Sequence, residues 1–138
     1  MVSSSLITKI FWRSKFYSFY LSKHKAESIK ITPPDPWPGD PVMGELIFQG
    51  NYYFGGQNFE SPNFPVWFPR GMLDDWLVDM HSFSWLRHLR AKSGSLARKH
   101  ARGIIQSWLE KNNSWQDFSW RGDILSRRIS AWITNNGF

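Results

Sequence analysis

The chain has 138 residues, a formal net charge of +6, nine tryptophans, eleven phenylalanines and no cysteine. This length suits a single domain, and the absence of cysteine excludes disulfides, thiolate metal sites and cysteine nucleophiles. The positive charge favours an acidic partner without identifying one, and so many aromatic side chains must be largely buried, here or against another surface.

Residues 5–22 are predicted to form a helix, because Leu6, Ile10 and Phe16 are roughly helically spaced with basic residues between them. The segment lacks the long apolar run and the small-residue cleavage site of a signal peptide, and the chain contains no run long enough for a membrane span. Such a basic aromatic helix could instead lie on an anionic membrane surface, which stays open as an alternative.

The next segment, PPDPWPGDP at residues 33–41, holds five of the eight prolines and predicts a rigid, non-helical crossing. Its carboxylates, Asp35 and Asp40, are expected to shape turns rather than to form a catalytic pair. Residues 45–59, ELIFQGNYYFGGQNF, alternate aromatic and aliphatic runs with glycine-containing turns, which predicts a small β meander.

Three amphipathic helices are predicted after this, over residues 72–91, 95–111 and 123–133, because apolar residues recur every three or four positions. Their apolar faces predict burial of Trp76, Trp108 and Trp132. Arg127 and Arg128 point about 100° apart on a helix. Arg128 shares the apolar face, so we expect it to be the more buried, paired with Asp123 or another carboxylate.

Candidate catalytic and metal sites are few. His81 and His88 lie two helical turns apart, too distant to share a metal ion by themselves, and His100 fits a hydrogen-bonded core position. Neither a nucleophile elbow nor a Ser/His/Asp arrangement is recognisable. We therefore predict no metal, no cofactor and no catalytic residue.

Four motifs in order resemble the N-terminal toroid region of the heparinase II/III-like family. They are PPDPWPGDP, HSFSWLRHLRA at residues 81–91, SLARKHARGIIQSWL at residues 95–109 and SWRGDILSRRISAWI at residues 119–133. Together they extend over roughly residues 31–133. The resemblance implies a mainly α fold, namely a partial (α/α) toroid preceded by the β meander and the proline-rich segment.

It also implies one incomplete domain over residues 1–138. Its parts would be an N-terminal helix and linker (1–30), the proline-rich segment and β meander (31–71) and toroid helices (72–138), with the rest of the toroid and a β-sandwich absent. Proteins of this family are polysaccharide lyases or their relatives, which cleave uronate-containing glycans by β-elimination. None of their catalytic Asn, His or Tyr residues matches a position here, so we expect this fragment to be inactive alone, and whether the parent protein is active stays open.

The implied partners are an acidic polysaccharide and the missing C-terminal part as a separate chain, and the implied location is the cell envelope or periplasm. Substrate contact is predicted on a concave helical surface, from His81, Trp85, Trp120 and Arg127, all partly exposed. The alternative is a basic aromatic module that binds nucleic acid or a membrane surface. Against nucleic acid, the chain contains no helix-turn-helix, zinc or RNP pattern.

Overall fold

The computed structural model describes residues 14, 19–20, 28–63 and 65–138. The helix predicted over residues 5–22, and the membrane-surface alternative attached to it, lie mostly outside these residues. Within them the fold is mainly helical, as predicted. The helices are α3 (Pro41–Phe48), α4 (Asp74–Ser82), α5 (Leu86–Lys92), α6 (Ser95–Lys111) and α7 (Gly122–Thr134), and one hairpin is formed by β1 (Asn51–Phe54) and β2 (Gln57–Glu60).

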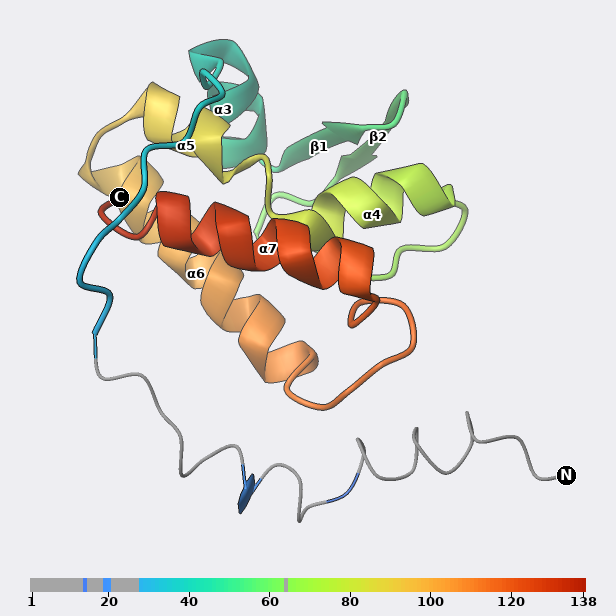
Figure 1. Cartoon of the computed structure of the whole chain (residues 1–138). Coiled ribbons are helices and arrows are strands. Elements are labelled where there is room, and N and C mark those ends of the chain that lie inside the picture. The colour runs from blue at the N-terminus through green and yellow to red at the C-terminus, as the bar shows by residue number, and fades with distance from the viewer. Residues whose placement is uncertain (1–13, 15–18, 21–27, 64) are drawn as a thin grey trace, which may run out of the picture.

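The arrangement has α7 crossing in front of α6, with α3 and α5 packed together at one end and the hairpin beside α4 (Figure 1). Thr32, just before the proline-rich segment, lines a pocket together with Gly137 and Phe138 at the C-terminus. No described helix is both long and apolar enough to cross a membrane.

The helix predicted over residues 72–91 is wrong in one respect, because the structure divides it into α4 and α5. Phe83 ends α4 in the left-handed region, with φ of 59°. Phe83 and Trp85 are 0% and 2% exposed. Residues two apart cannot share one face of a helix. The break lets both aromatic side chains enter the core.

The β meander predicted over residues 45–59 is also partly wrong, since residues 45–48 belong to α3. Asp40 caps this helix, because its carboxylate accepts hydrogen bonds from the backbone N–H groups of Val42 and Met43, and Pro41 takes the first helical position. The strands after α3 form a two-stranded antiparallel hairpin that pairs Asn51 with Glu60 and Phe54 with Gln57. Gly55 and Gly56 form its turn with φ of 52° and 77°, as a tight hairpin requires.

Aromatic side chains form the centre of the core. Trp76 and Trp108 are 0% and 2% exposed, which confirms their predicted burial, whereas Trp132 is only half-buried. Phe83 contacts Trp108 and Trp132 edge to face, with ring centroids 5.9 and 5.3 Å apart. These contacts join the α4–α5 corner to α6 and α7.

Candidate functional site

His81, in the last turn of α4, is completely buried and hydrogen-bonded on both sides of its ring. Its Nε2 lies 2.9 Å from the Trp67 carbonyl oxygen, and its Nδ1 lies 2.9 Å from the indole N–H of Trp108. Because an indole only donates and a carbonyl only accepts, the ring must be neutral with its proton on Nε2. Burial lowers the pKa of His81 to about 4; the Trp67 carbonyl opposes that shift and the Arg128 charge adds to it.

Arg128, on α7, is 1% exposed. Its Nη1 donates to the carbonyl oxygens of His81, at 3.2 Å, and Ser119, at 2.8 Å. Its guanidinium carbon lies 4.2 Å from the ring centroid of Trp108 and also faces Trp120 and Trp132. Arg128 therefore connects α7 to α4, α6 and the loop before α7.

The predicted burial of Arg128 is confirmed, and its predicted carboxylate partner is wrong. Asp123 pairs instead with Arg121, at 2.7 Å. Arg127 is exposed, as expected. Its charge acts on Asp79, whose pKa is raised by burial and lowered in part by Arg127.

Trp85 is buried rather than partly exposed. Its indole N–H donates to the Met80 carbonyl oxygen at 3.1 Å, and its ring stacks on Phe83 with centroids 5.2 Å apart. The expected partial exposure of His81 and Trp85 is therefore wrong, because both side chains complete the core at the α4–α5 break. Of the four predicted contact residues, half-buried Trp120 and exposed Arg127 are accessible, and substrate contact itself stays a prediction.

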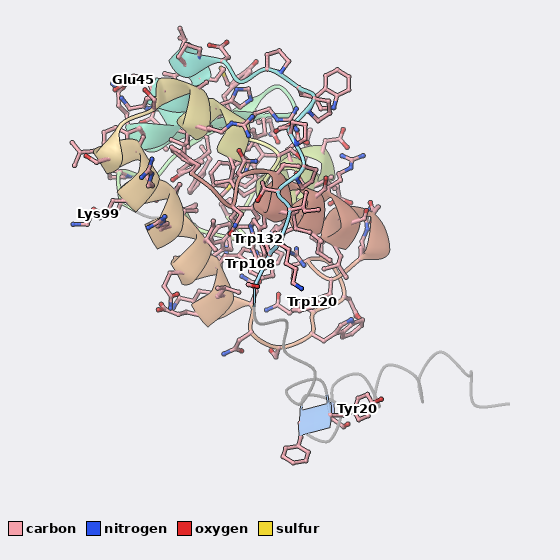
Figure 2. The ribbon with its side chains drawn as sticks, turned by 60° about the vertical axis from the view of Figure 1, so that its left-hand side comes forward. Tyr20, Glu45, Lys99, Trp108, Trp120 and Trp132 are labelled. Carbon is pink, nitrogen blue, oxygen red and sulfur yellow. The ribbon has the colours of Figure 1, made fainter. Side chains whose placement is uncertain are left out.

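A pocket of about 320 Å³ lies where Arg128 and three tryptophans meet. We call it the Arg128 pocket; its walls come from the C-terminal part of α6, the adjoining loop and α7, and include Trp108, Asn112, Trp120, Leu125, Arg128, Ile129 and Trp132. Figure 2 shows Trp108, Trp120 and Trp132 close together between α6 and α7. The Trp108 ring centroid is 6.2 Å from that of Trp120 and 5.7 Å from that of Trp132.

One residue of this pocket was predictable from the sequence. The position of Arg128 on the apolar face of its helix predicted its burial. Asn112 was missed because it reads as an ordinary helix end; it is 1% exposed, and its side-chain N–H donates to the Trp108 carbonyl oxygen at 3.1 Å.

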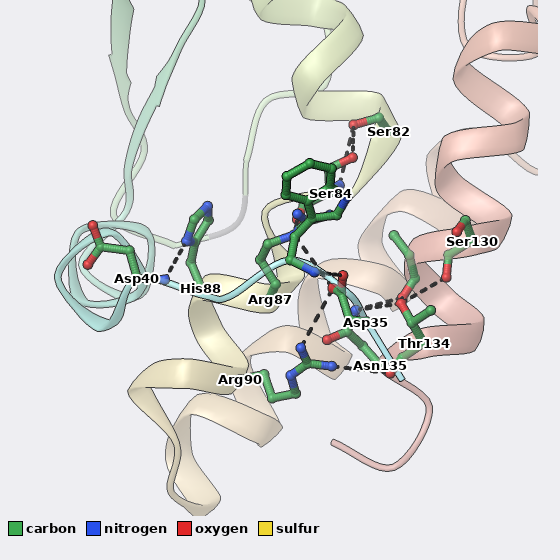
Figure 3. A network of polar contacts seen from close by, with 12 residues as sticks. Asp35, Asp40, Ser82, Ser84, Arg87, His88, Arg90, Ser130, Thr134 and Asn135 are labelled. Atoms are coloured by element: carbon green, nitrogen blue, oxygen red, sulfur yellow. Dashed lines mark hydrogen bonds and ion pairs between the residues drawn. The ribbon is translucent and has the colours of Figure 1, made fainter. Parts of the chain in front are cut away.

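A second polar cluster fastens the proline-rich segment to α5 (Figure 3). The Asp35 carboxylate, 4% exposed, lies 3.6 Å from both Arg87 and Arg90. It also accepts the backbone N–H of Trp37, which confirms its predicted turn. Arg90 donates in addition to the Thr134 carbonyl oxygen, at 3.2 Å, at the end of α7.

In the same cluster, His88 Nδ1 accepts the backbone N–H of Asp40 at 2.9 Å. The charged groups therefore hold the chain crossing in place. Among the described residues, no group of three or more His, Cys, Asp or Glu side chains could hold a metal ion.

Comparison with known proteins gives one distant similarity. Over 109 residues, 76% of this chain, the sequence is 29% identical to FtsZ-localized protein C of Caulobacter vibrioides (strain NA1000 / CB15N). The chain spans only 18% of the length of that protein. No protein-family model matches the sequence, and no solved structure matches it.

Proposed function

We propose that this chain is a non-catalytic structural part of a heparinase II/III-like protein. It would form the beginning of the helical toroid of a polysaccharide lyase, or a relative of one, that acts on uronate-containing glycans by β-elimination. The motif order over residues 31–133 and the succession α4 to α7 support this proposal.

The proposal that this part is non-catalytic rests on one observation: the polar groups of His81, Trp108 and Arg128 make their hydrogen bonds within the core. β-Elimination needs a base for the C5 proton and a group that neutralises the uronate carboxylate. His81 has both ring nitrogens occupied within the core. The fully buried Tyr52 is no better placed, because burial raises the pKa of its hydroxyl.

The first test is a lyase assay on heparin, heparan sulfate and other uronate polymers, following ultraviolet absorbance of unsaturated products. We expect no absorbance rise from the purified chain. A rise that survives repurification would contradict a non-catalytic part. Tight binding to nucleic acid without preference for glycan would favour the nucleic-acid alternative.

The second test concerns the toroid. A structure of FtsZ-localized protein C should show that its region similar to this chain contains the helices α3 to α7 arranged as they are here. Further antiparallel helix pairs should then continue the ring. A matched region standing alone as a separate small domain would overturn the toroid proposal.

The similarity to a protein named for its localisation with FtsZ supports a second candidate. In this candidate, the chain contributes to placing its parent protein with FtsZ. A fluorescently tagged chain expressed in Caulobacter vibrioides would then co-localise with FtsZ. Diffuse fluorescence at normal expression, with intact fusion protein, would contradict it.

A further inference from the structure

Residues that line the Arg128 pocket carry polar atoms that the described part of the protein leaves unmatched. Four side-chain atoms of its lining residues are closed off from solvent and have no hydrogen-bond partner among the residues that the structure describes: Nη2 of Arg128, Nε1 of Trp120, Nε1 of Trp132 and Oδ1 of Asn112. Three of the four are donors. A buried donor without an acceptor is unfavourable, so an acceptor that enters this part of the molecule would be favoured.

The charge of the pocket is equally one-sided. No carboxylate lies within ion-pair distance of Arg128 in the part of the chain that the structure describes; the guanidinium meets carbonyl oxygens and indole faces instead. Burial lowers the pKa of Arg128 to about 10, so the side chain is still protonated at neutral pH. A buried cation without a counterion selects an anion.

The remaining wall residues favour a ligand that is apolar apart from its anionic group. Leu109 and Ile129, 41% and 46% exposed, lie at the pocket together with Leu125. These aliphatic side chains offer no hydrogen bond to sugar hydroxyls. A volume of about 320 Å³ suits a molecule of one ring rather than a polymer.

We propose that the Arg128 pocket binds a small organic carboxylate with an apolar, ring-sized body. The carboxylate accepts hydrogen bonds from Arg128 Nη2 and from the indole N–H of Trp120. Because these donors are closed off from solvent, a ligand reaches them only when a side chain of the wall moves. Among the tryptophans of the wall, Trp120 is the one that lies in the loop between α6 and α7 and not in a helix, and it is only half-buried. This site is independent of lyase chemistry.

The experiment titrates the folded chain with benzoate and follows the indole and guanidinium N–H resonances by NMR. Benzyl alcohol is the neutral control and glucuronate the polar carboxylate control. We expect saturable shifts of the Trp120, Trp132 and Arg128 signals with benzoate. Binding should be about tenfold weaker for benzyl alcohol, because a charge-assisted hydrogen bond is lost.

Two matched pairs of variants locate the site without removing Arg128. Trp120→Phe keeps a ring but loses one donor and should weaken benzoate binding several-fold, whereas Trp115→Phe, in the same loop but not in the pocket wall, should not. Leu125→Glu places a carboxylate three residues before Arg128, on the same helix face, and should abolish benzoate binding. Leu125→Gln should retain it.

Three results would overturn the proposal. One is the absence of shifts at these resonances at high millimolar benzoate, which would mean that the polar atoms bind water and not a carboxylate. Another is binding of benzyl alcohol as tight as that of benzoate, which would show that the pocket does not recognise the negative charge. The third is binding of glucuronate as tight as that of benzoate, which would show that the pocket does not select an apolar ring.

Discussion

At the residue scale, Arg128 is a charged side chain placed in the core, at 1% exposed. It fills a position on the apolar face of α7, yet its hydrogen bonds reach the carbonyl oxygens of His81 in α4 and Ser119 in the preceding loop. A hydrophobic side chain at that position would fill space but leave both carbonyls without a donor. An isolated buried carbonyl costs about 1–3 kcal/mol.

Replacing Arg128 by Met should therefore destabilise the fold, even though it removes a buried charge. We expect Arg128→Met to lower the free energy of unfolding by roughly 2–4 kcal/mol, measured by urea denaturation. Arg127→Met, at the exposed neighbouring position, is the control and should stay within about 0.5 kcal/mol of wild type. Equal effects of the two substitutions would show that the carbonyl bonds contribute little.

The protonation of His81 makes stability depend on pH. Its pKa is about 4 in the folded chain against 6.5 in a solvated histidine. Between these values the unfolded chain therefore binds more protons than the folded chain. The contribution of His81 to the free energy of unfolding is complete above pH 6.5 and decreases as the pH falls towards 4. Between pH 7 and 5 the loss from this residue is about 2 kcal/mol.

His81→Gln removes the titrating group, so denaturation curves at pH 7 and pH 5 should differ less for this variant than for wild type. His88→Gln is the control. The pKa of His88 is also lowered, mainly by burial, but the residue is only half-buried and should account for less of the pH dependence. An unchanged pH dependence in His81→Gln would mean that the ring is not neutral in the native core.

The predicted site residues show where sequence patterns stop being informative. Helical spacing correctly separated Arg128 from Arg127, because burial of a helix face depends only on local geometry. It failed for His81 and Trp85, which lie beside the apolar stripe of a continuous helix but become core residues once the chain turns at Phe83. The donor–acceptor chain from Trp108 through His81 to Trp67 joins segments far apart in sequence, which periodicity does not record.

At the element scale, the packing of α3 on α5 depends on close backbone approach. A Cβ atom built on Gly44 would lie 2.2 Å from the His88 carbonyl oxygen. That oxygen belongs to helix backbone and cannot move independently. The two helices can therefore pack this closely only with glycine at position 44.

Gly44→Ala should destabilise the chain by about 1–3 kcal/mol, because the helices must separate. Helix propensity alone predicts the opposite sign, since alanine is favoured over glycine by about 1 kcal/mol within a helix. Gly122→Ala, at the start of α7 with no atom within 4 Å of the built Cβ, is the control and should be neutral or slightly stabilising. Thermal unfolding of both variants separates the two effects, and a stabilised Gly44→Ala would refute the close-packing argument.

Element boundaries were predictable where the signal was local. The ranges of α6 and α7 agree with the predicted helices at residues 95–111 and 123–133 to within about a residue. The missed helix α3 had a usable local signal, because Asp40 followed by Pro41 is a favourable helix start. The α4–α5 break had none, since it results from the burial of two aromatic rings that are adjacent in space only after folding.

At the scale of the whole molecule, the exposed apolar side chains are unevenly placed. Leu109 on α6 and Ile129 on α7 both line the Arg128 pocket. Val42 and Leu96 are more exposed, at 68% and 70%, but do not line that pocket. If the chain begins a toroid, the next helices would pack against the α6–α7 surface around the Arg128 pocket.

The isolated chain should therefore be only marginally stable and should bind a hydrophobic dye at the Arg128 pocket. Repeating helical hairpins need neighbours to cover their apolar faces, and contiguous apolar surface attracts dye and promotes association more than scattered side chains do. The double substitution Leu109→Gln with Ile129→Gln should reduce dye fluorescence and self-association. Val42→Gln with Leu96→Gln should change them less, although these positions are more exposed. A monomeric wild-type chain that melts cooperatively without binding dye would show that this surface needs no cover.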